Sequence, residues 1–180
     1  MSRTLTKFVD IKGCAVWLCD ENGTPIKETP QIDNTTISMP DLEFGTTEVN
    51  LLGTLSVPDF TRIDNFQLSV NMPVDNDEAM ELFKPGLQQW VISYAVSNFN
   101  SGTGLEEVTG YRIYAKGYIT RIPSSEISKG GDGKANLPMN LVSLKKWKLG
   151  ERTAVYAIDR LTGKVEIQGV NYTQPIDELY

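Results

Sequence analysis

The stretch Asn65-Phe66-Gln67-Leu68-Ser69-Val70-Asn71-Met72 alternates polar and apolar side chains without a break. Successive side chains of a β-strand point to opposite faces, so this period of two predicts a half-buried strand. Its polar face consists only of uncharged residues: Asn65, Gln67, Ser69 and Asn71. A neutral, hydrated face is expected where a strand lines an aqueous channel, and it also fits an ordinary solvent-facing sheet.

The rest of the chain repeats this pattern and predicts a mainly β protein. Extended segments are expected at residues 13–19, 31–39, 43–55, 87–99, 107–122, 135–149, 153–158 and 164–170. The long segments 87–99 and 107–122 flank the glycine-rich turn at 101–104 and predict an antiparallel hairpin. A second, closing hairpin is expected around Leu161-Thr162-Gly163.

One short α-helix is expected after the alternating strand. Asp75 or Asn76 can cap its first turn, and Pro85-Gly86 ends it. Before that strand, residues 46–62 carry glycine and proline and few core anchors, which predicts a long surface excursion. Residues 171–180 are polar and are expected to form a C-terminal arm.

Composition indicates one well-cored domain over residues 1–180 and limits the partners. The net charge of −6 disfavours tight binding of nucleic acid, which requires clustered cations. No stretch has the length of a transmembrane helix, and the N-terminus has no signal-peptide layout, so no membrane insertion is expected. Cys14 and Cys19 are expected to be reduced packing residues.

The sequence offers no constellation for catalysis. The chain has no histidine, which removes the commonest general base and the usual zinc ligands. The glycine-rich segment 130–134 lacks the strand–loop–helix context of a phosphate-binding loop. Lys145, Lys146 and Lys148 flank Trp147, a pattern that predicts a solvated strand edge or, alternatively, contact with an acidic partner or phosphate. We therefore expect no enzyme activity, no metal and no cofactor.

Several phrases, taken in order, resemble the major tail tube proteins of contractile-tailed phages and R-type bacteriocins. They are residues 14–23 (CAVWLCDENG), 37–42 (ISMPDL), 156–161 (YAIDRL) and 165–171 (VEIQGVN). The first phrase is similar to the family's opening strand and turn, and the last two to its terminal hairpin. The similarity spans roughly residues 8–172, and the polar C-terminal arm is the main departure from the family.

This resemblance implies a β-sandwich or half-barrel with one flanking helix. Copies would form a hexameric ring with a large continuous β-barrel, and the rings would stack into a tube that conducts DNA or ions. The neutral residues Asn65, Gln67, Ser69 and Asn71 would line the lumen. The excursion 46–62 would contact the next ring through Gly53, Thr54, Leu55, Pro58 and Asp59.

The implied partners are further copies of the chain, a tail sheath protein, baseplate, tail terminator and tape measure proteins, and DNA in passage. The implied location is the virion tail, assembled in the host cytoplasm. A tube protein of a type VI secretion apparatus, which shares this architecture, is the alternative within the same class. A small-molecule-binding β-barrel is a further alternative, although the even alternation leaves no obvious apolar cavity lining.

Overall fold

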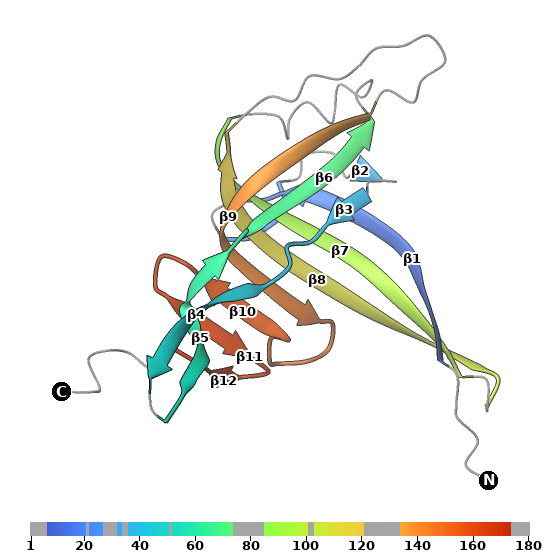
Figure 1. Cartoon of the computed structure of the whole chain (residues 1–180). Coiled ribbons are helices and arrows are strands. Elements are labelled where there is room, and N and C mark those ends of the chain that lie inside the picture. The colour runs from blue at the N-terminus through green and yellow to red at the C-terminus, as the bar shows by residue number, and fades with distance from the viewer. Residues whose placement is uncertain are drawn as a thin grey trace.

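The computed structural model describes residues 7–20, 22–26, 32–33, 36–50, 52–73, 85–100, 103–120 and 134–173. These residues are mainly β-strand and contain no helix; the helix expected between Asp75 and Pro85 lies outside the described residues (Figure 1). The strands are β1 Lys7–Leu18, β2 Ile32–Asp33, β3 Thr36–Ser38, β4 Glu43–Asn50, β5 Thr54–Asp64, β6 Gln67–Pro73, β7 Gly86–Asn100, β8 Leu105–Ile119, β9 Lys134–Lys148, β10 Tyr156–Asp159, β11 Lys164–Ile167 and β12 Val170–Asn171.

All pairings are antiparallel. One sheet has the order β12-β11-β10-β9-β8-β7-β1-β2, and β6 joins it by pairing with β9 on one side and with β3 on the other. Strands β4 and β5 form a separate hairpin. The path from β12 to β2 is open at both ends, so the described strands form no closed barrel.

Strand β9 belongs to two layers. Its first half, residues 134–140, pairs with β6, whereas residues 143–146 pair with β10. The pairing with β8 shifts register between Lys116 and Gly117, and this shift leaves Val142 as an extra residue on β9. Such a bulge bends a strand and lets it pass from one sheet into another. As a result, β3, β6 and the first half of β9 cross over β1, β7 and β8 (Figure 1).

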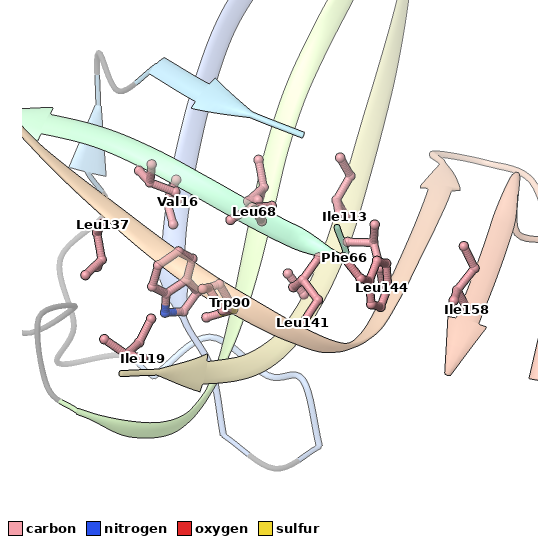
Figure 2. Close-up of a cluster of buried hydrophobic side chains, with 14 of the residues drawn as sticks. Val16, Phe66, Leu68, Trp90, Ile113, Ile119, Leu137, Leu141, Leu144 and Ile158 are labelled. Atoms are coloured by element: carbon pink, nitrogen blue, oxygen red, sulfur yellow. The ribbon is translucent and has the colours of Figure 1, made fainter. Parts of the chain in front are cut away.

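The core fills the space between these two layers. Figure 2 shows Leu68 from β6 and Leu137 and Leu141 from β9 meeting Trp90 and Ile113 from the long strands. All five side chains are at most 2% exposed. Burying a side chain of this size stabilises the fold by about 1.5–3 kcal/mol. The Trp90 indole N–H is also satisfied, because it donates to Gln88 Oε1 at 2.9 Å.

Most predicted strands are confirmed, with changed boundaries. The alternating stretch is β6, in which Leu68 and Val70 are buried and Gln67 is exposed. Asn65 does not lie on this strand, because its φ of 52° places it in the preceding turn. The hairpins β7–β8 and β10–β11 are also as predicted.

Three predictions need correction. The extended segment expected at 43–55 is not one strand, because β4 ends at Asn50 and the antiparallel β5 begins at Thr54. The expected strand at 31–39 is two short strands, β2 and β3, which pair with different partners, β1 and β6. The expected excursion at 46–62 is regular rather than a loop, because β4 and β5 pair from Glu43–Asp64 to Asn50–Thr54. Its glycine and proline content is accommodated in a two-stranded ribbon with a bulge after Phe44.

Gly117 tests the packing at the bend of β9. A Cβ at this position would lie 2.4 Å from the Asn140 carbonyl oxygen and 2.7 Å from Met139 Cγ. We expect Gly117→Ala to lower the free energy of unfolding by roughly 1–3 kcal/mol, because backbone must shift to admit the methyl group. Gly53→Ala is the matched control, since nothing lies within 4 Å of its Cβ. Urea unfolding measures both, and equal stability of the two variants would contradict the packing argument.

Candidate interaction surfaces

The first candidate surface is a neutral face on the outward side of β3, β6 and β9. Strand pairing places Gln67 beside Asn140, and Asn71 between Asn136 and Thr36. Gln67 Nε2 donates to Asn140 Oδ1 at 3.3 Å, and Asn136 Nδ2 donates to Asn71 Oδ1 at 2.8 Å. The neutral face consists of Thr36, Ser38, Gln67, Ser69, Asn71, Asn136, Pro138 and Asn140, and the ladder of β6 and β9 continues beyond it to the pair Pro73 and Lys134.

Sequence reasoning identified Gln67, Ser69 and Asn71 and missed the residues on the neighbouring strands. A signal for β9 was present, since Asn136, Pro138 and Asn140 alternate with buried Leu137 and Met139. The pairing of β6 with β9 spans more than sixty residues of sequence and could not be derived from that alternation. Asn65 is exposed in the turn and does not belong to the neutral face.

The second candidate surface is a basic face on the opposite side of the sandwich. On β8 the buried residues Ile113 and Ala115 alternate with Arg112, Tyr114 and Lys116, which therefore point away from the core. Register places Arg112 beside Trp147, Tyr114 beside Lys145, and Lys116 beside Ser143. The basic face thus consists of neighbouring cationic and aromatic side chains: Arg112, Tyr114, Lys116, Lys145 and Trp147.

Two hollows of about 520 and 580 Å³ share Lys145, Trp147 and Asp159 in their walls. Among the described residues, ion pairs join Arg62 to Asp64, Lys148 to Glu151 and Lys164 to Glu166, and none of them involves a cation of the basic face. The expectation that the lysine cluster marks a strand edge is wrong, because β9 is paired there with β8 on one side and β10 on the other. Lys145 and Lys146 point to opposite faces of the sheet.

The third candidate surface is an arm formed where β1, β7 and β8 extend beyond the core (Figure 1). It consists of residues 7–11, 96–100 and 105–109. Among the described strands, the part of β1 that precedes Ala15 pairs only with β7. The part of β8 that precedes Tyr111 likewise pairs only with β7. Apolar side chains on the arm are exposed, namely Ile11, Phe99, Leu105 and Val108, at 41–69%. Both lateral edges of the arm therefore offer backbone and apolar groups for pairing.

The fourth candidate surface is the β4–β5 hairpin. Aromatic contacts anchor its base, where the ring centroids of Phe44 and Phe60 are 5.0 Å apart and those of Phe60 and Tyr172 are 5.4 Å apart. At its tip Leu52 is fully exposed, and Leu55 and Val57 nearby are 56% and 39% exposed. Of the predicted contact residues, Gly53 lies at the tip, and Thr54, Leu55, Pro58 and Asp59 lie on β5.

Burial shifts the pKa values of both cysteine thiols. Burial raises the pKa of the Cys14 thiol and raises that of Cys19 to about 11, so both stay protonated at neutral pH. Neither thiol is in a disulfide. Within the described ranges, no three His, Cys, Asp or Glu residues cluster as metal ligands, and no helix is long and apolar enough to cross a membrane.

No protein-family model matches the chain, and no curated protein matches its sequence significantly. The interaction surfaces described above therefore carry the functional argument.

Proposed function

We propose that this chain is the structural subunit of a tube, in which rings of identical copies stack to form the conduit of a contractile phage tail or a related tail-like particle. The observation that carries the proposal is the arm, whose two lateral edges lack a strand partner among the described residues. The resemblance of residues 14–23, 37–42 and 156–171 to tail tube proteins supports the same class. A tube of a type VI secretion apparatus is the alternative with the same geometry.

Ring formation would follow from pairing of unlike edges. The β1 edge and the β8 edge lie on opposite sides of the arm, so a β1 edge that meets the β8 edge of another copy makes a heterologous contact. Such contacts repeat until a ring closes, and closure leaves no exposed edge. Because β1 and β8 both pair antiparallel with β7, they run in the same direction. The junction in a ring would therefore be a parallel ladder.

Stacking of rings would use the β4–β5 hairpin. Its base is held by Phe44 and Phe60, while its tip carries exposed Leu52 and Leu55. An anchored ribbon with an apolar tip gains stability when another surface covers that tip. Contact between successive rings is open-ended, so it builds a filament rather than a closed particle.

The neutral face is our proposed lining of the bore. A channel for DNA requires groups that hydrate well and do not hold phosphates, and cations would retard the passage of a polyanion. The side chains of the neutral face are amides, hydroxyls and the ring of Pro138, whereas the opposite face carries Arg112, Lys116 and Lys145. In this arrangement the basic face lies outside, where a sheath protein would dock, and baseplate, terminator and tape measure proteins would contact the tube at its ends and in its bore.

Val108→Pro tests the ring junction. The Gly110 carbonyl accepts the Leu149 N–H at 2.9 Å, so the backbone N–H and carbonyl of Gly110 face away from β7. Because the direction of these groups repeats every second residue along a strand, those of Val108 also face away from β7. Proline removes the outward N–H of Val108, and we expect rings to be lost while the protomer stays folded. Val108→Thr, which keeps that N–H, should still form rings. Electron microscopy and light scattering measure assembly, and rings formed by the proline variant would overturn the proposed junction.

A shortened hairpin tests the stacking contact. Residues 48–56 are replaced by Asn-Gly, which joins the paired residues Thr47 and Val57 through a tight turn and keeps both aromatic anchors. We expect this variant to unfold cooperatively and to form rings that do not polymerise into tubes. Micrographs of the concentrated protein show the difference. Tubes of normal length from the shortened protein would place the stacking contact elsewhere.

Lysine substitutions test the bore. Gln67→Lys and Ser69→Lys together should slow the passage of DNA at low salt, because each phosphate contact steepens the log–log salt dependence of binding by about one unit. The matched control carries alanine at both positions and adds no charge. DNA release from assembled particles is compared at low and high salt. Unchanged release together with loss of sheath attachment would assign the neutral face to the exterior of the tube.

A further inference from the structure

An apolar groove of about 470 Å³ lies between the two layers of the sandwich. Its floor includes Ile92 and Ile113 of the long strands, which are at most 2% exposed, and its opposite wall includes Ile37 and Met39. The even alternation of the strands predicted no apolar cavity lining. The groove exists because Ile37 of β3 and the nearby Met39 face the side chains of β7 and β8 across the sandwich. The pattern of a single strand cannot predict this arrangement.

The groove runs across the strands. Ile11 and Cys14 of β1 lie at one end, and Lys146 of β9 with Tyr156 of β10 lies at the other. The order β1-β7-β8-β9 separates these ends by three strand spacings of about 4.8 Å, or roughly 14 Å. One edge of β1 pairs with β7. Along its other edge, β2 pairs only with Ala15 and Val16, so no described strand covers the edge of β1 beside Ile11, where the groove ends. The groove is therefore elongated and has one apolar end and one polar end.

The polar end carries a positive charge. Lys146 Nζ lies 4.9 Å from the ring centroid of Tyr111 and 5.7 Å from that of Tyr94, and these two rings stack at 5.3 Å. The ring faces hold the ammonium by cation–π attraction without neutralising it. None of the ion pairs found among the described residues includes Lys146. Burial, and next the neighbouring Tyr94, raise the pKa of Tyr156 to about 12, so its hydroxyl remains a hydrogen-bond donor.

We propose that this groove binds an amphiphile with a linear aliphatic body and a carboxylate head, with the body against the accessible side chains of Ile11, Ile37 and Met39 and the carboxylate at Lys146. An apolar lining with a few polar groups at one end is the usual composition of a small-molecule site, and the volume lies in the usual range. A carboxylate matches the ammonium and the tyrosine hydroxyls, because charge-assisted hydrogen bonds are stronger than neutral ones. This inference is independent of the proposed tube.

Decanoate is the probe, and 1-decanol, which lacks the carboxylate, is the matched ligand. Binding to unassembled protomers is measured by calorimetry and by protection of Cys14, the half-buried thiol in the groove, from alkylation. Peptide mass analysis separates Cys14 from the buried Cys19. Decanoate at ten times its Kd should slow Cys14 alkylation about tenfold. Decanol should bind roughly tenfold or more weakly than decanoate.

Lys146→Met should remove the preference for decanoate over decanol, and Lys146→Arg should retain it. Lys148→Met is the control on the same strand, because Lys148 pairs with Glu151 and does not line the groove. Equal binding of the two ligands to the unmodified protein, or a preference that survives Lys146→Met, would overturn the proposal. Protection of Cys14 that grows with protein concentration in the absence of ligand would also overturn it, since a second copy would then fill the groove. Tube formation without decanoate binding would refute only this inference.

Discussion

The sharing of β9 between two layers is the constraint on which the rest of the structure depends. Its first half pairs with β6 and its second half with β10, and the extra residue Val142 allows the bend between them. Gly117 lies at the same point, where a side chain would meet the backbone of β9. Without this bend β6 would have no layer to cover, and Leu68 and Val70 would lose the buried positions they share with Trp90.

The sequence predicted the elements whose patterns are local. The alternation around Leu68, the two long strands and the turn-forming Leu161-Thr162-Gly163 each identify a strand or hairpin by side-chain period or turn chemistry. The partners of β6 are β3 and β9, one before it and one far after it, and no periodic pattern specifies them. For the same reason the segment 31–39 was expected to be one strand, although its two halves pair with different neighbours.

The candidate surfaces were predictable to a lesser degree because each combines several strands. Gln67, Ser69 and Asn71 follow from one strand, but the amide pair of Asn71 and Asn136 requires the register of β6 against β9. The lysines around Trp147 were visible as a cluster, yet the sheet separates them. Lys145 joins the basic face, and Lys146 reaches the groove between the layers. A one-residue step along a strand thus assigns neighbouring lysines to different surfaces.

The distribution of charge over the two outward faces connects the fold to the proposed assembly. A net charge of −6 describes the whole chain, whereas a ligand or partner meets one face at a time. Interactions between exposed charges are screened beyond about 8–10 Å, so the cations of the basic face and the amides of the neutral face act as separate surfaces. If the arm edges close a ring, one face must line the bore and the other must face outward. In the proposed tube, the orientation of the sandwich would therefore decide whether DNA meets amides or cations.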